Sequence, residues 1–252
     1  MNVIDEIIRR TQKRVAKLPS SFSESRPGTR RSLARAVRDP GARTAVIAEI
    51  KCASPSRGVI RRNVDMPGMA RVLEGSGCVA LSILTEPCFF GGSVRDIPRV
   101  RAAVDIPVLR KDFIIDERQL GESRAIGADA VLLIAAVLGE DLHEYVDLAG
   151  SYGLESLVEI HNEGEAESAL ATGAGLIGIN NRDLATLTVD RSTTRRLSGP
   201  VRKAGRLIVS ESGMRSPDDV REMKPYCDAF LIGSSIMSHG QPEKKLEEFV
   251  CV

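Results

Sequence analysis

The stretch DERQLGESRAIGADAVLLIAAV, residues 116–137, contains the unit that decides the fold. Its first part mixes charged and apolar residues and closes near a glycine, which is typical of an amphipathic helix that ends at a turn. Its second part, AVLLIAAV at 130–137, is a short apolar run. Such a run after a helix predicts a parallel strand that is buried on both faces.

The same helix–strand unit recurs along the chain. Eight short, mostly apolar runs are predicted strands, at 46–50, 79–85, 106–113, 130–137, 154–160, 176–180, 206–212 and 229–235. Because amphipathic stretches separate them, the strands are expected to pair in parallel. Eight units in about 200 residues predict an α/β fold, a (β/α)8 TIM barrel. The rival, an open doubly wound sheet, would usually carry a glycine-rich fingerprint after its first strand, and KCASPSRG at 51–58 is not one.

The residues before the first strand form a predicted N-terminal helical extension. Apolar residues recur at helical spacing in its first part, and a loop rich in Pro and Ser precedes a short basic helix. The predicted segments are a helix at 2–18, a loop at 19–29 and a helix at 30–38, within an extension at 1–45. We expect the extension to pack on the barrel at 46–252, so that residues 1–252 form a single domain.

Composition argues against several classes of function. Lys plus Arg number 35 against 34 Asp plus Glu, and aromatic residues make up 4%, so a general nucleic-acid binder is not expected. No apolar run reaches the roughly 18 residues that a membrane span needs. Five cysteines without a CxxC pair and three scattered histidines predict neither disulfides nor a metal site. We expect a reduced cytoplasmic protein that is a monomer, or at most a weak dimer.

Polar residues interrupt the apolar runs at their carboxyl ends, where barrel enzymes hold their catalytic residues. Burying a charge without a partner is costly, so recurrence at one end of six strands indicates a site rather than isolated ion pairs. The residues are Glu49, Lys51, Arg110, Lys111, Asp112, Glu159, Asn180, Asn181, Arg182, Asp183, Glu211, Ser212, Gly213, Gly233, Ser234 and Ser235.

Small residues after the last two strands favour a phosphate ligand. ESG at 211–213 and GSS at 233–235 offer backbone N–H groups where barrels commonly bind phosphate, and a short helix is expected to begin near Ser235. ASPSRG, after the first strand, adds the hydroxyls of Ser54 and Ser56. The sequence therefore predicts a small phosphorylated molecule as the ligand.

Seven segments, in order along the predicted barrel, resemble signature segments of the indole-3-glycerol phosphate synthase family. They are IAEIKCASPSRG at 47–58, LTEPCFFGGS at 84–93, VLRKDFIID at 108–116, LVEIHN at 157–162, IGINNRDLATL at 177–187, VSESGM at 209–214 and FLIGSSIM at 230–237. The resemblance implies ring closure of 1-(2-carboxyphenylamino)-1-deoxyribulose 5-phosphate, with loss of carbon dioxide and water, in tryptophan biosynthesis. It implies no cofactor and no metal.

The resemblance also implies catalytic roles at matching positions. Lys111 matches the lysine that protonates the ketone oxygen, a step that a lowered pKa would favour, and Glu159 matches the base that completes dehydration. Lys51 matches the lysine that holds the substrate carboxylate and takes part in proton donation. Glu49 and Glu211 match acidic residues that orient the lysines. How the two lysines divide the proton transfers stays open.

Substrate contacts follow from the same resemblance. Asn180 and Arg182 match residues that contact the ribulose hydroxyls and the anthranilate carboxylate. The phosphate cradle is matched by Ser54, Gly213, Gly233 and Ser234, with Ser212 beside it. The apolar slot for the anthranilate ring is matched by Phe89, Phe113, Leu184 and Leu231.

Two alternatives stay in view. Phosphoribosylanthranilate isomerase, another enzyme on this scaffold, needs a Cys–Asp pair, whereas the first strand supplies Glu49 and Lys51. A phosphosugar-binding barrel without catalysis would be expected to have lost Lys111 or Glu159, and both are present.

Overall fold

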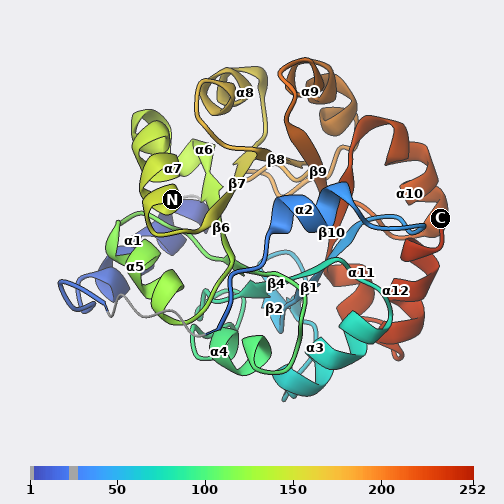
Figure 1. The fold of residues 1–252 in the computed structure, drawn as a ribbon, viewed down its shortest axis with the longest axis horizontal. Helices are drawn as coiled ribbons and strands as arrows, with labels where there is room; N and C mark the ends of the chain where they lie inside the picture. Colours follow the sequence, from blue (N-terminus) through green and yellow to red (C-terminus); the bar gives the residue numbers. More distant parts are fainter. Residues whose placement is uncertain (1–2, 23–27) are drawn as a thin grey trace.

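The computed structural model describes residues 3–22 and 28–252 and forms a closed barrel (Figure 1). Eight parallel strands pair in the order β1-β10-β9-β8-β7-β6-β5-β4, and β1 closes the ring by pairing with both β10 and β4. They are β1 Val46–Ile50, β4 Ala80–Leu84, β5 Val108–Lys111, β6 Ala130–Ile134, β7 Glu155–Ile160, β8 Leu176–Asn180, β9 Leu207–Glu211 and β10 Ala229–Ile232. The predicted (β/α)8 TIM barrel is confirmed.

Helices surround the ring of strands, as Figure 1 shows. They are α3 Met66–Gly75, α4 Asp96–Arg101, α5 Arg118–Ala125, α6 Ala135–Leu138, α7 Leu142–Ser151, α8 Glu163–Leu170, α9 Ser192–Lys203, α10 Pro217–Met223, α11 Ser234–Met237 and α12 Pro242–Val250, with 3-10 turns at Gly139–Asp141 and Lys224–Tyr226. An antiparallel pair, β2 Ala53–Ser54 and β3 Gly58–Val59, lies in the loop after β1.

Several predicted strands extend beyond the observed ones. The run at 130–137 ends as a strand at Ile134, because Ala135–Leu138 winds into α6. The run at 229–235 ends at Ile232, and α11 begins at Ser234. An apolar run indicates that a segment is buried, but it does not distinguish a strand from a short buried helix that follows the strand.

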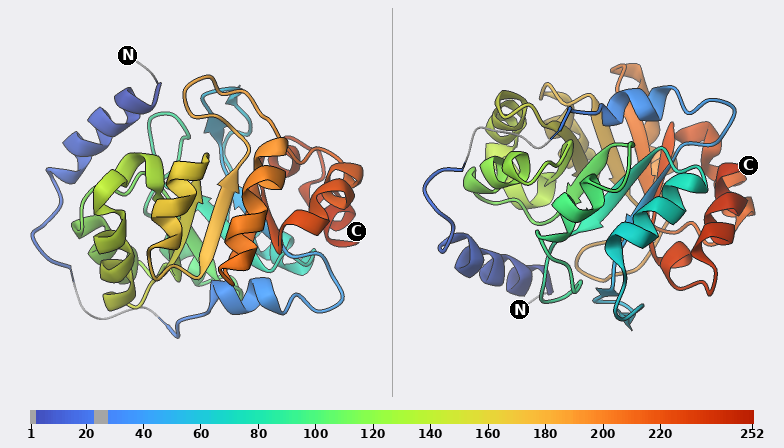
Figure 2. Two further views of the ribbon diagram at one scale, coloured as in Figure 1. Left: turned by 90° about the horizontal axis from the view of Figure 1, so that it is seen from above. Right: turned by 60° about the horizontal axis from the view of Figure 1, so that its bottom comes forward.

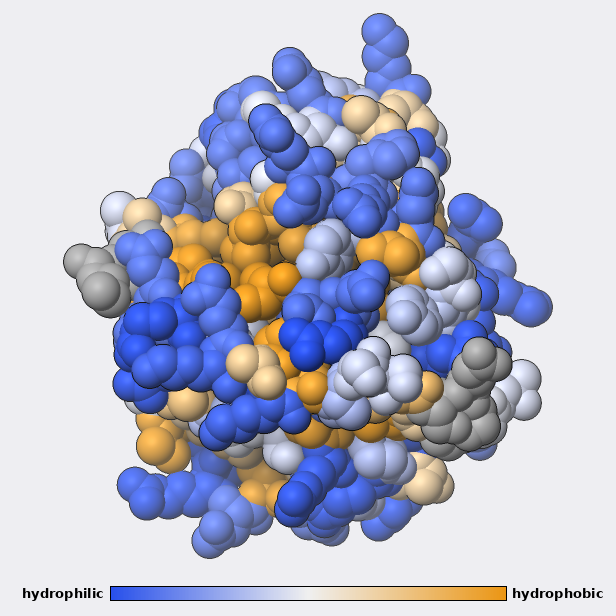
Figure 3. Space-filling model, turned by 90° about the vertical axis from the view of Figure 1, so that its left-hand side faces the viewer, coloured by the Kyte–Doolittle hydropathy of each residue, from blue (hydrophilic) through white to orange (hydrophobic). Residues whose placement is uncertain are grey.

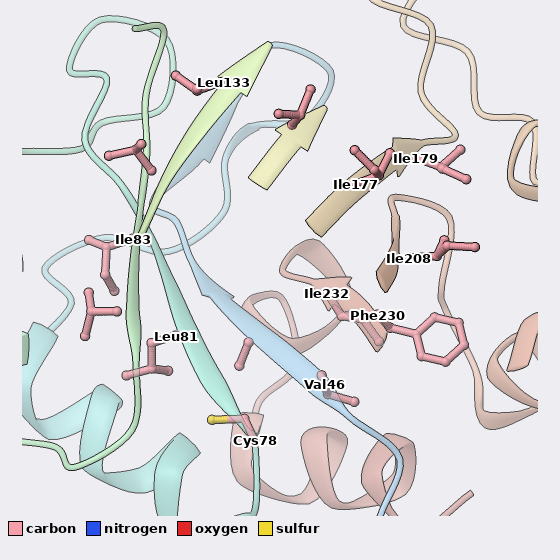
Figure 4. Close-up of a cluster of buried hydrophobic side chains, with 14 of the residues drawn as sticks. Val46, Cys78, Leu81, Ile83, Leu133, Ile177, Ile179, Ile208, Phe230 and Ile232 are labelled. Carbon is pink, nitrogen blue, oxygen red and sulfur yellow. The ribbon is translucent and has the colours of Figure 1, made fainter. Parts of the chain in front are cut away.

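Apolar side chains line both sides of the strand ring, since successive strand residues face opposite sides. Leu81, Ile177 and Phe230 belong to the cluster between the strands and the surrounding helices, part of which Figure 4 shows. Ile47 and Leu109 belong to a second cluster, which fills the barrel. Burial on both sides explains why the strands read as nearly continuous apolar runs.

Helix α2, Leu33–Arg38, closes the barrel at the amino ends of the strands. Leu33 is fully buried and joins the inner apolar cluster. The carboxylate of Glu155, the first residue of β7, accepts hydrogen bonds from the Ser32 hydroxyl at 2.6 Å and from the Ala34 N–H at 2.8 Å. Because a helix this short is unstable alone, these tertiary contacts hold it in place.

Helix α1, Val3–Val15, lies at the opposite end of the barrel, as Figure 2 shows. Ile7 packs into the inner cluster, and Arg14 Nη2 donates to Asp112 Oδ1, just beyond β5, at 2.7 Å. Residue 2 of the predicted helix and residues 23–27 of the predicted loop lie outside the described residues. The extension therefore contacts both ends of the barrel.

The face of the molecule in Figure 3 is mostly hydrophilic, with hydrophobic surface visible between the hydrophilic side chains. Within the described residues, the exposed large hydrophobic side chains are Val59 and Val72. None of the helices in this part of the chain combines the length and the apolar character needed to cross a bilayer.

Leu33→Ala tests the role of α2 as the plug of the barrel. The substitution leaves a cavity among fully buried residues, so it is expected to lower the free energy of unfolding by about 3 kcal/mol. Urea denaturation measures the loss, and Val72→Ala on the exposed side of α3 is the control, expected to change stability by less than about 0.5 kcal/mol. Equal stability of the two variants would contradict the role of Leu33.

Candidate active site

Charged side chains enter the barrel where its apolar filling ends. Strand alternation puts Lys111 on the same side as the inward Leu109, and Glu159 on the same side as the inward Leu157. The same rule turns Arg110 outward. Five charged residues from four strands or their ends meet in one cavity at the carboxyl end of the barrel, and they are Glu49, Lys51, Lys111, Glu159 and Glu211.

Lys111 is the centre of this cluster. Its Nζ lies 3.1 Å from Glu159 Oε2 and 2.8 Å from Glu211 Oε2. The Lys51 ammonium lies 2.5 Å from Glu49 Oε1. All five side chains are largely buried, with at most 16% of a side chain exposed. Three carboxylates and two ammonium groups therefore balance one another in an apolar surrounding.

A lowered pKa would favour proton donation by Lys111. In the unliganded protein the pKa of Lys111 is instead raised above the usual lysine value. Burial acts to lower it, and the surrounding carboxylates of Glu159, Glu211 and Glu49 outweigh burial. Lys111 is therefore a charged proton donor in the unliganded protein.

The two carboxylates beside Lys111 are shifted in opposite directions. Burial acts to raise the pKa of Glu159, but Lys111 and His161 outweigh it and hold that pKa well below its usual range. Burial raises the pKa of Glu211 to about 7, and the charge of Glu159 adds to the effect against the opposing pull of Lys111. At neutral pH Glu159 is thus an ionised base, and Glu211 shares a proton with the cluster.

Two glycines make room for the carboxylates. A Cβ atom at Gly178 of β8 would collide with Oε1 of Glu211, and one at Gly233, just after β10, would collide with Oε1 of Glu49. Glycine is required at these points by close approach, not by its backbone freedom. Gly178 is a site residue that the sequence reasoning did not single out.

The segments predicted to bind phosphate line the same cavity. The loop after β9 carries Ser212 with φ 64° and Gly213 with φ 94°, and strain of this kind at a non-glycine residue is concentrated at functional sites. The hydroxyl of Ser54 is buried in the cavity wall without a hydrogen-bond partner among the described residues. Gly233 and Ser234 lie in the wall as well.

Arginines add positive charge to the cavity. Arg182 Nη1 donates to the Leu187 carbonyl at 2.7 Å, and Asn180 Oδ1 accepts from the Arg182 N–H at 3.0 Å. Burial lowers the pKa of Arg182, and the charges of Arg57 and Arg215 add to the effect. Sequence reasoning missed Arg57 and Arg215, although each directly follows a segment predicted to bind phosphate, SPS at 54–56 or SGM at 212–214. The arrangement suits an anion with more than one charged group.

The structure places three of the four residues proposed for the anthranilate slot in the cavity wall, namely Phe113, Leu184 and Leu231. Phe89 is not part of that wall. Arg10 lies over its ring, 5.4 Å from the centroid.

Phe90 lines the cavity instead, with its ring centroid 6.4 Å from that of Phe113. The cause is a tight turn in which the Glu86 carboxylate accepts the N–H groups of Cys88, Phe89 and Phe90. Two adjacent phenylalanines carry the same sequence signal, so spacing alone could not separate them.

Helix α1 completes the apolar side of the cavity with Val3, Ile4 and Ile7. Its Arg14 binds Asp112, whose other oxygen accepts from Arg110 Nη2 at 3.1 Å. Arg110 is buried outside the ring, where its Nη1 donates to the Gln119 carbonyl and the Ser123 hydroxyl of α5, as strand alternation predicts. The mouth of the barrel and the end of β5 are therefore joined by buried ion pairs.

Residues 3–22 and 28–252 contain no group of three or more His, Cys, Asp or Glu side chains that could hold a metal ion. The charged groups of the cavity are acids, bases and cations suited to proton transfer and anion binding.

The chain is similar to known proteins along most of its length. Residues 4–249 match the family model of indole-3-glycerol phosphate synthase. The indole-3-glycerol phosphate synthase of Caldanaerobacter subterraneus subsp. tengcongensis is 47% identical over 82% of this chain and 80% of its own. That of Thermoanaerobacter sp. strain X514 is 40% identical over 98% of this chain and 97% of its own.

A solved structure of tryptophan synthase from M. tuberculosis shares the fold, with a TM-score of 0.65, 12% identity and coverage of 87% of this chain and 98% of that one. The match to the family model spans nearly the whole barrel and most of the extension. The alignments with the two relatives also cover most of the length of each relative. The chain belongs to the indole-3-glycerol phosphate synthase family.

Proposed function

We propose that the cavity converts 1-(2-carboxyphenylamino)-1-deoxyribulose 5-phosphate into indole-3-glycerol phosphate, carbon dioxide and water. Family membership supports the reaction. The observation that carries the assignment to this cavity is Lys111, a charged donor held between Glu159 and Glu211. An acid beside an ionised base is what a ring closure followed by dehydration needs.

Substrate binding uses the two halves of the cavity. The phosphate is proposed to lie against the Ser54 hydroxyl and the backbone of the loops at 212–213 and 233–234. The anthranilate ring is proposed to lie against Phe90, Phe113, Leu184, Leu231 and the apolar face of α1. Lys51 and Arg182 would bind the carboxylate, and Asn180 the ribulose hydroxyls. Binding at both ends holds the ring carbon near the ketone, which lowers the entropic barrier to ring closure.

Ring closure forms a bond between the carboxylate-bearing ring carbon and the ketone carbon. Lys111 donates its proton to the ketone oxygen, so that no bare alkoxide develops in a buried site. The bond to the carboxylate then breaks, and its electron pair restores the aromatic ring as carbon dioxide leaves.

Dehydration completes the indole. Lys51 is proposed to protonate the departing hydroxyl, and Glu159 to take the proton from the adjacent ring carbon. Glu49 and Glu211 hold the two lysines, because their carboxylates pair with the ammonium groups. The proton transfers at ring closure and dehydration use residues of this chain, and we propose that no cofactor takes part.

We further propose a monomer in the cytoplasm. Exposed large apolar side chains within the described residues are confined to Val59 and Val72, which is little for a dimer interface. The five cysteines are free, as a reducing compartment would keep them. The isomerase alternative lacks its Cys–Asp pair in the cavity wall, and the non-catalytic alternative leaves the buried Lys111 cluster without a use.

Lys111→Met should abolish proton donation while keeping the apolar stem of the side chain. Turnover is expected to fall by at least about 1000-fold, measured by the fluorescence of the indole product. Lys203→Met, at the exposed end of α9, is the control and should keep wild-type turnover. Near-normal turnover of a folded Lys111→Met protein would remove Lys111 from its role.

Gly178→Ala should displace the Glu211 carboxylate without unfolding the barrel, because the colliding atom is the end of a side chain. We expect kcat to fall at least about tenfold. The matched control is Gly150→Ala in α7, where an added Cβ has open space and where alanine should raise stability by about 0.5–1 kcal/mol. An unchanged kcat for Gly178→Ala would show that the position of Glu211 does not matter.

Ser234→Asp places a negative charge in the proposed phosphate site. Repulsion should raise KM at least about tenfold, and a smaller effect on kcat is expected because the reacting atoms lie at the other end of the substrate. Ser168→Asp on the exposed face of α8 controls for added charge. Equal KM values in the two variants would exclude Ser234 from the phosphate site.

A further inference from the structure

His161 is a buried titratable group that the steps above do not use. It follows β7, two residues after Glu159, and 11% of its side chain is exposed. Its Nε2 has no hydrogen-bond partner among the described residues and lies 3.4 Å from Glu159 Oε1, an ion-pair distance, while the other oxygen of Glu159 lies 3.1 Å from Lys111 Nζ. Glu159 is therefore bracketed by two groups that carry protons, one on each carboxylate oxygen.

The far side of the His161 ring is held by a second carboxylate. Nδ1 lies 3.0 Å from Glu165 Oε2, which also accepts the His161 backbone N–H at 2.8 Å. Glu165 Oε1 accepts from the Asn162 amide at 2.6 Å, and the Asn162 side chain caps α8 through the Glu165 N–H. The first turn of α8 thus fixes the ring in place beside Glu159.

His161 is a protonated imidazolium, because each of its ring nitrogens lies beside a carboxylate oxygen. Burial acts to lower its pKa, but the contacts with Glu159 and Glu165 outweigh burial and raise the pKa to about 10. The positive charge of His161 also contributes to the lowered pKa of Asp183, after the larger effect of its hydrogen bonds with Thr186. From the cavity side, the groups that face Glu159 are Lys111 and Glu211.

The proposed chemistry consumes a proton. The substrate carboxylate leaves as neutral carbon dioxide, so each turnover takes up one proton to balance the charge. In the proposed mechanism Lys111 loses its proton first, at ring closure, and only 16% of its side chain is exposed before substrate binds. A neutral amine among three carboxylates is unfavourable, because their negative charges favour the ammonium form.

We propose that His161 is a positioning residue that stores this proton and returns it to Lys111 through Glu159. The Nε2–H bond breaks as an O–H bond forms on Glu159, and Glu159 then passes a proton to the free amine of Lys111. His161 is left neutral with its proton on Nδ1, shared with Glu165. After the product leaves, one proton from solvent restores Nε2, and the proton that Glu159 gained at dehydration restores Lys51. One proton moves at each step, and no oxidant or co-reactant is needed.

The test rests on the proposed function, and activity of the wild-type protein in the same assay establishes that function separately. His161→Gln should lower kcat at least about tenfold and leave KM within about twofold. Imidazole buffer, raised in concentration at constant pH and ionic strength, should restore part of the lost kcat because it supplies the missing acid. His143→Gln, on the exposed face of α7, is the matched control and should match the wild type.

Glu165→Gln provides a second variant that keeps the ring in place. Removing one carboxylate is expected to lower the pKa of His161, so that His161 loses its proton at a lower pH than in the wild type. The alkaline limb of kcat is expected about one pH unit below that of the wild type. The proposal is overturned if His161→Gln keeps wild-type kcat, if its loss shows no buffer dependence, or if the Glu165→Gln limb is unchanged while the wild type is active.

Discussion

Charge neutralisation around Lys111 is the constraint on which the rest of the site depends. An ammonium group inside an apolar barrel is tolerable only beside carboxylates, and Glu159 and Glu211 supply them within 3.1 Å. Glu211 in turn needs space, which Gly178 of β8 provides. The identity of residues on four strands therefore follows from the burial of one lysine. The charges of Lys111 and His161 outweigh burial and hold Glu159 ionised, whereas burial raises the pKa of Glu211 to about 7.

Much of this arrangement could be predicted from the sequence because strand alternation is strict. A residue two places beyond an inward apolar side chain is inward as well, so Lys111 follows Leu109 and Glu159 follows Leu157. Small residues after the last strands marked the proposed phosphate site by the same logic. These inferences need only the period of a strand and the end at which parallel strands finish.

Other features depend on contacts between distant segments, which no local pattern encodes. The choice between Phe89 and Phe90 is made by hydrogen bonds from three N–H groups to Glu86. The direction of the Lys111 pKa shift depends on how many carboxylates converge, and a list of strand ends does not reveal their distances. The apolar face of α1 was visible as helical spacing, but its place in the cavity wall was not.

The bond between Arg14 and Asp112 links the N-terminal helix to the residue after Lys111. Asp112 also accepts hydrogen bonds from Arg110, Thr85 and the Phe113 N–H. One carboxylate therefore ties the helix that lines the mouth to the strand end that bears Lys111. A displacement of α1 would break a hydrogen bond one residue from the proposed proton donor, across 98 positions of sequence.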